Sequence, residues 1–167
     1  MEKPAVESSP SDMAFAATWA GSIGGSIVAL FFLLVDIVAG QPLHTPSVLA
    51  SAIFLGEVPV GPDVLRLELV ALYTLVHFVV FTAVGAAFAW IVTHTSDVAA
   101  QGVIVPAGLF GTLTAGLMAV DLLVAPGVVA TIGLVWTLVG NALATGGMYA
   151  FYRSVLGAPA GEAVPHA

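Results

Sequence analysis

The chain has 167 residues, of which 59% are hydrophobic and 8% are charged, and ten acidic against three basic residues give a formal net charge of −7. A soluble domain carries about 25% charged residues, so this composition excludes an ordinary soluble protein and predicts a surface that faces lipid. The acidic balance excludes a nucleic-acid footprint, and the lack of cysteine excludes disulfides, thiolate metal sites and cysteine nucleophiles.

A polar tail and a first membrane span open the chain. Residues 1–12 are polar and contain Ser and Pro, which predicts a disordered tail. A long uncharged stretch follows and predicts a first span over residues 13–38. Within it, Gly21 and Gly25 have the spacing that lets two helix backbones approach closely in lipid. Asp36 lies about one turn before the end of this span.

The connection after the first span contains a short helix. Gly40 and Pro42 end the first span, and Pro46 suits the first turn of a new helix. We expect this helix over residues 46–55, lying at the membrane surface. His44 belongs to the loop that precedes it.

The second span covers about residues 64–94. Its central part, residues 69–92, has no charged residue and as a helix would extend roughly 36 Å, enough to cross a hydrocarbon layer about 30 Å thick. Arg66 and Glu68 stand at its start, and His77 lies near its middle.

The third span covers about residues 99–124. Gly111 is one of several small residues that predict close helix packing in lipid. Asp121 lies about one turn before the break that Pro126 and Gly127 impose.

The fourth span covers about residues 128–152. Gly140 and Gly147 are again expected to pack closely against a neighbouring helix. Asn141 lies near the middle of the span. Residues 154–167 are expected to form a flexible tail.

These elements predict an all-α integral membrane protein, an up-down bundle of four transmembrane helices within residues 13–153, with a short interfacial helix between the first and second. Four spans place both termini on one side. Lys3 and Arg153 on that side against Arg66 on the other favour a cytoplasmic location for the termini, in a bacterial-type inner membrane. Most aromatic positions agree with this count, because four of them fall at the terminus-side interface: Trp19, Trp90, Tyr149 and Tyr152. Tyr73 and Trp136 do not, since they are expected nearer the other face.

The first and third spans end alike, with the segments VDIVAG and VDLLVAPG. One interpretation is a duplicated helical hairpin with parallel pseudo-symmetry. The other is chance, because the same few small and apolar residues dominate all membrane segments.

Five polar residues gather at the predicted end of the bundle opposite the termini: Asp36, His44, Arg66, Glu68 and Asp121. Three interpretations are open. Arg66 pairs with the carboxylates and ties three helices together, or Asp36 and Asp121 build an ion or proton site with His44 and Glu68, or the side chains are solvated at the interface.

His77 and Asn141 are the polar residues expected deepest in the membrane. His77 either hydrogen-bonds within the bundle, with Asn141, Ser22 or Ser26 as partners, or ligates a haem or a chlorophyll-type pigment. No second histidine lies at its depth, so a haem would be five-coordinate or shared with another chain. Asn141 is expected to join two helices.

No nucleotide-binding, metalloprotease or hydrolase motif is present. The sequence therefore favours a non-catalytic small subunit or scaffold of a larger membrane complex, with the lipid bilayer and other membrane subunits or further copies of the chain as partners. One alternative is a small oligomeric transporter or channel with Asp36 and Asp121 at one mouth. The other is a haem- or pigment-binding subunit that uses His77.

Overall fold

The computed structural model describes residues 10–59, 65–95 and 97–156. Four helices in this part of the chain are long and apolar enough to cross a membrane. The predicted four-span all-α fold is therefore confirmed, and the chain is a four-span helical membrane protein. The helices, in order, are α1 (Pro10–Val38), α2 (His44–Leu55), α3 (Leu67–His94), α4 (Val98–Leu123), α5 (Val128–Ile132) and α6 (Leu134–Val155).

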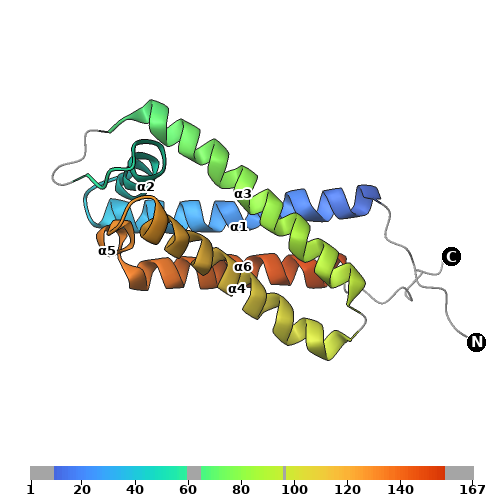
Figure 1. Cartoon of the computed structure of the whole chain (residues 1–167). Coiled ribbons are helices and arrows are strands. Elements are labelled where there is room, and N and C mark those ends of the chain that lie inside the picture. The colour runs from blue at the N-terminus through green and yellow to red at the C-terminus, as the bar shows by residue number, and fades with distance from the viewer. Residues whose placement is uncertain (1–9, 60–64, 96, 157–167) are drawn as a thin grey trace, which may run out of the picture.

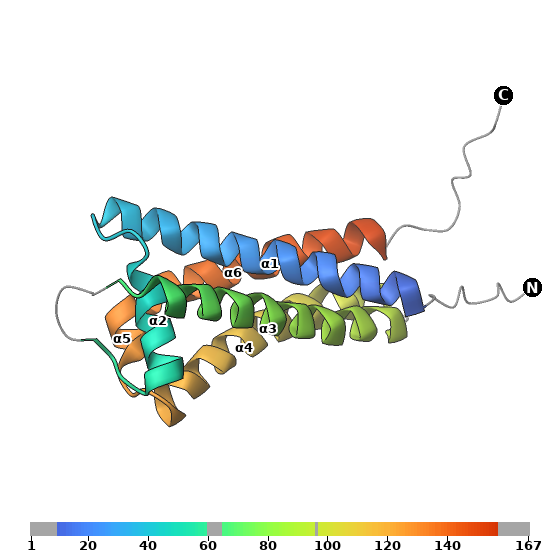
Figure 2. The same ribbon diagram turned by 90° about the horizontal axis from the view of Figure 1, so that it is seen from above.

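The four long helices run side by side, and the two short helices lie together at one end of the bundle (Figure 1). The start of α1 and the end of α6 lie at the other end, as an even number of spans requires. Helix α1 packs most extensively on α3 and α6, whereas α4 packs mainly on α6 and touches α3 less. The same arrangement seen from above shows α2 lying across the long helices (Figure 2).

Helices α1 and α3 pack with their backbones in contact because each carries a glycine at the crossing. A Cβ atom on Gly21 would lie 2.5 Å from the Cα atom of Thr82, and one on Gly85 would lie 2.6 Å from the carbonyl oxygen of Ala17. Both of these neighbouring atoms belong to the backbone, so they cannot move aside as a flexible side chain could. Close approach of this kind is the main source of helix association in lipid, where no water is expelled.

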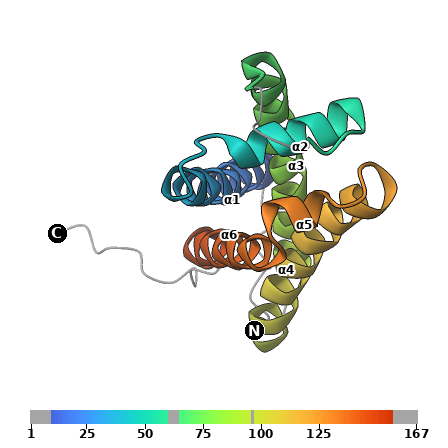
Figure 3. The same ribbon diagram turned by 90° about the vertical axis from the view of Figure 1, so that its left-hand side faces the viewer.

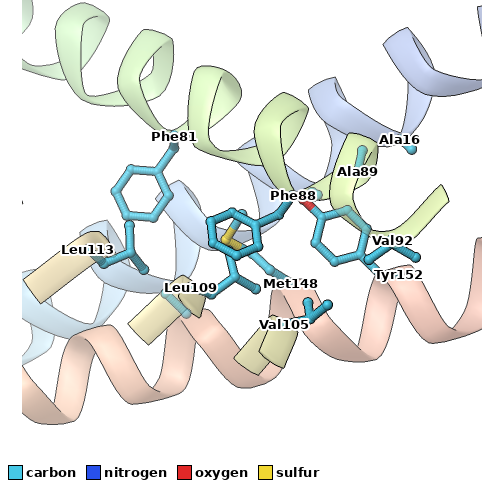
Figure 4. Close-up of a cluster of buried hydrophobic side chains, with 12 residues drawn as sticks. Ala16, Phe81, Phe88, Ala89, Val92, Val105, Leu109, Leu113, Met148 and Tyr152 are labelled. Atoms are coloured by element: carbon cyan, nitrogen blue, oxygen red, sulfur yellow. The ribbon is translucent and has the colours of Figure 1, made fainter. Parts of the chain in front are cut away.

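The main apolar core lies in the half of the bundle nearer the termini. Phe88 of α3, Leu109 of α4 and Met148 of α6 meet there (Figure 4). Tyr152 is 1% exposed, and its hydroxyl donates a hydrogen bond to the carbonyl oxygen of Gly85 at 2.7 Å. The expectation that Tyr152 belongs to an interfacial belt is therefore wrong, because its ring fills the core and its hydroxyl bonds α3.

The predicted fourth span is not one helix. Gly133 has φ +90° and separates α5 from α6, so the spanning helix begins at Leu134 rather than at residue 128. A residue with positive φ cannot continue a right-handed helix, and glycine adopts this conformation without a Cβ clash.

Two other boundaries differ from the sequence prediction. Helix α1 begins at Pro10, so residues 10–12 are helical, while the rest of the predicted N-terminal tail lies outside the described residues. Helix α6 continues to Val155, and residues 157–167 of the predicted C-terminal tail also lie outside them.

Helix α2 is packed into the end of the bundle. Val48 and Ala52 are fully buried, and with Leu49 they contact Val128 and Ile132 of α5 in a second apolar cluster. Seen from this end of the molecule, α2 and α5 lie next to each other (Figure 3). The two short helices therefore cover one end of the bundle as a pair.

Candidate functional site

Asp36 holds the start of α2 in place. Its side chain is 3% exposed, and its two carboxylate oxygens accept hydrogen bonds from the backbone N–H and the hydroxyl of Thr45, each at 2.8 Å. Leu43, the residue before the first turn of α2, has φ +67° and an apolar side chain that cannot cap a helix. Asp36 therefore supplies, from the preceding helix, the acceptor that a capping residue normally provides.

Asp121 does the same for α5. Its carboxylate accepts hydrogen bonds from the backbone N–H groups of Gly127 at 3.1 Å and Val129 at 2.8 Å. Gly127 precedes α5 with φ +94° and has no side chain to offer. In both cases a carboxylate near the end of a spanning helix bonds the second N–H of the short helix that follows.

The order of elements is the same in α1–α2–α3 and in α4–α5–α6. Each series has a long helix, a cap carboxylate, a short helix preceded by a left-handed residue, and a long returning helix. This correspondence favours the duplication interpretation of the two Val-Asp segments.

Among the described residues, Arg66 does not tie the two carboxylates together. Arg66 and Glu68 are exposed at the start of α3, and the Arg66 side chain forms no capping hydrogen bond there. Within residues 10–59, 65–95 and 97–156, neither Asp36 nor Asp121 forms an ion pair with Arg66. His44 is the first residue of α2, and its backbone N–H donates to Gln41 at 3.0 Å.

His77 connects α3 to α1. Its Nε2 lies 3.0 Å from the carbonyl oxygen of Gly25. Because a carbonyl oxygen only accepts hydrogen bonds, Nε2 carries the proton and Nδ1 is left as an acceptor. The hydroxyl of Tyr73 lies 3.5 Å from Nδ1, and the imidazole packs on Phe81 with ring centroids 4.6 Å apart. The partner of His77 is thus a backbone carbonyl, and the prediction of Asn141, Ser22 or Ser26 is wrong.

Metal ligation needs the free lone pair of an imidazole nitrogen. Because Nε2 donates to Gly25, only Nδ1 retains a lone pair, and the hydroxyl of Tyr73 lies 3.5 Å from it. The hydrogen bond to Gly25 agrees with the interpretation of His77 as a neutral residue bonded within the bundle.

Asn141 joins α6 to α4, as expected for an amide within the membrane. It is 7% exposed, and its Nδ2 donates to Oγ1 of Thr114 at 3.2 Å. Its Oδ1 accepts no hydrogen bond from any residue that the structure describes.

A cavity of about 300 Å³ lies between the long helices beneath α2 and α5. All six helices contribute to its lining, which is mostly apolar. A smaller cavity of about 180 Å³ between α1, α2 and α3 shares Tyr73 and His77 with it. The polar side chains that line the larger cavity are Tyr73, His77, Thr112, Thr137 and Asn141.

Four of the five glycines predicted to pack helices do so. A Cβ on Gly25 would lie 3.1 Å from Phe78, one on Gly140 would lie 3.2 Å from Phe31 and Phe32, and one on Gly147 would meet the end of the Ile27 side chain. With Gly21 these positions lie at helix contacts.

Gly111 is the exception, since no atom lies within 4 Å of its Cβ position. Gly111 therefore makes no close helix contact within the described part of the chain, and its predicted packing role stays a prediction. Sequence reasoning missed Gly85, the partner of Gly21 at the α1–α3 crossing, although a single glycine within the apolar α3 segment was a usable signal.

Comparison of the chain with protein-family models, with curated proteins and with solved structures finds no match.

Proposed function

We propose that this protein is a non-catalytic small subunit or scaffold of a larger membrane complex, and that α4 is the helix that contacts the partner. The support is the exposure of α4. Only 11% of its central apolar stretch is buried, compared with 28% to 33% in the other three spans.

The exposed face of α4 has the composition of a helix contact. Small residues at every fourth position are exposed along it: Ala107, Gly111, Ala115 and Ala119. In lipid, such a row allows another helix to approach closely, whereas bulky side chains such as Leu122 suit contact with acyl chains. In the described part of the single chain, no helix packs against this row of small residues.

The alternative of a channel with Asp36 and Asp121 at its mouth has less support. Each carboxylate is engaged as a cap for a short helix, and the Asp36 side chain is almost fully buried. Both groups have a structural reason to be present.

The test is extraction from the native membrane in mild detergent, followed by identification and quantification of co-purifying membrane proteins. We expect a stoichiometric partner, and we expect Gly111→Leu to reduce its recovery at least about five-fold, since a bulky side chain would separate the two backbones. Gly146→Leu on α6 is the matched control, because Gly146 also has no atom within 4 Å of its Cβ position. Recovery of the chain as a lone monomer, or an equal effect of both variants, would contradict the proposal.

A further inference from the structure

The cavity beneath α2 and α5 has the properties of a small-molecule site. Its volume of about 300 Å³ falls at the lower end of the range for ligand pockets. Its wall is built from apolar side chains such as Phe32, Leu49 and Leu117, with a few polar groups among them. This combination of an apolar wall and few polar groups is typical of sites that bind small apolar molecules.

Two of the polar groups in this lining have no partner. His77 bonds Gly25, and the hydroxyl of Thr137 donates to the carbonyl oxygen of Gly133. In contrast, Oδ1 of Asn141 and the hydroxyl of Thr112 form no hydrogen bond with the described residues. Asn141 is 7% exposed, and the side chains of Asn141 and Thr112 both line the cavity.

The Asn141 oxygen and the Thr112 hydroxyl indicate which chemical group a ligand of this cavity would carry. A carboxamide oxygen accepts a hydrogen bond, and a threonine hydroxyl can donate one. A hydroxyl group on a ligand can donate to the carboxamide oxygen of Asn141 and accept from the hydroxyl of Thr112. Among the described residues that line the cavity there is no Asp, Glu, Lys or Arg, so a charged head group would be buried without a counter-charge.

The ligand reaches this site from the bilayer. Val80 of α3 and Thr112 and Gly116 of α4 line the cavity and are exposed on the side of the bundle, where these two helices make few contacts. At the end of the bundle, buried Leu49 and Ile132 close it. A side opening within the spanning region faces the hydrocarbon layer.

We propose that this cavity binds a neutral lipid-soluble molecule whose one polar end carries a hydroxyl group, as in a long-chain alcohol. The apolar chain occupies the apolar wall, and the hydroxyl bonds Asn141 and Thr112. The site is independent of the partner-binding role proposed for α4.

The experiment is photolabelling of the purified full-length protein in lipid nanodiscs with a diazirine derivative of hexadecanol, followed by mass spectrometry of the labelled peptides. We expect labels on lining residues of α3, α4 and α6, which unlabelled hexadecanol prevents. The corresponding diazirine alkane, which has no hydroxyl, and the corresponding fatty acid are expected to label these residues at least about three-fold less.

Variants separate cavity binding from general lipid contact. Gly116→Leu places an apolar side chain in the lining of the cavity, where no atom lies within 4 Å of the Cβ position, and we expect at least a five-fold loss of labelling. Gly111→Leu on the same helix is the matched control and should leave labelling unchanged. Thr112→Val removes a hydroxyl that bonds no described residue, so it should reduce alcohol labelling about three- to five-fold without loss of folding.

Equal labelling by the alkane, or unchanged labelling in Gly116→Leu, would overturn the proposal. The assay uses the isolated protein, so its outcome does not depend on a partner subunit. The response to Gly111→Leu distinguishes the two ideas, since that variant tests partner recovery and leaves the cavity intact.

Discussion

At the scale of single residues, the carboxylates at the ends of α1 and α4 act as helix caps supplied from outside the capped helix. Asp36 is the more buried of the two, and it satisfies both the N–H and the hydroxyl of Thr45. Removal of a buried acceptor leaves its donors unsatisfied, which costs about 1–3 kcal/mol for each group. The cap is therefore expected to contribute more to stability than any exposed charge in this chain.

We expect Asp36→Ala to lower the free energy of unfolding by roughly 2–4 kcal/mol, and Asp121→Ala by about 1 kcal/mol, because Asp121 is less buried. Asp36→Asn keeps one acceptor oxygen and should have a smaller effect than Asp36→Ala. Reversible unfolding in mixed detergent micelles measures all three. Arg66→Ala is the control, since its side chain is exposed, and a change within about 0.5 kcal/mol is expected. A loss for Arg66→Ala equal to that for Asp36→Ala would restore the ion-pair interpretation.

At the scale of helices, the contact between α1 and α3 depends on Gly21 and Gly85, whose Cα atoms face the other helix's backbone. A methyl group added there cannot be accommodated by a rotamer change, because its nearest neighbours are main-chain atoms. Gly147 differs, since the nearest atom is the terminal carbon of Ile27, which can move. The glycines of this chain are therefore unequal in what they contribute.

This ranking can be measured with three alanine variants. Gly21→Ala should destabilise the protein by about 3 kcal/mol or more, Gly147→Ala by about 1 kcal/mol or less, and Gly111→Ala by nothing measurable in the isolated chain. Thermal unfolding of each variant in the same detergent gives the order. If Gly111→Ala lowered the thermal stability as much as Gly21→Ala, that result would contradict the exposed position of Gly111.

The same contrast explains which helix features the sequence could predict. Hydropathy located the spans because long apolar stretches need lipid, and the spacing of Gly21 and Gly25 identified a real contact face. The break at Gly133 could not be predicted from hydropathy, because a glycine among apolar residues hardly changes the mean hydropathy of the segment. The spacing of Gly111 identifies a small-residue face but does not tell which neighbour covers that face.

The candidate site was harder to predict for a related reason. Apart from the Thr45 hydroxyl, the groups that bond Asp36, Asp121 and His77 are backbone N–H and carbonyl groups, which leave no mark in a sequence. Matching side chains by depth therefore offers Asn141, Ser22 and Ser26 as partners of His77, and matching charges by position makes an Arg66–carboxylate pair one of three interpretations. The cavity depends on all six helices and could be seen only once they were assembled.

At the scale of the whole molecule, α1–α2–α3 and α4–α5–α6 traverse the membrane in the same sense, and both short helices lie at the end opposite the termini (Figure 1). The chain contains no cysteine, so single cysteines can report the side on which a position lies. Ser11 and Ser154 are exposed at the terminus end, and Glu57 is exposed after α2.

We expect a membrane-impermeant maleimide added to intact cells to label Glu57→Cys, and to label Ser11→Cys and Ser154→Cys only after the membrane is permeabilised. The excess of basic residues at the terminus end gives the direction, since loops rich in Lys and Arg stay in the cytoplasm. Permeabilised cells, in which all three variants should react, control for accessibility. Labelling of Ser11→Cys and Ser154→Cys from opposite sides would refute an even number of spans, whereas labelling of both from outside would keep the fold and reverse the orientation.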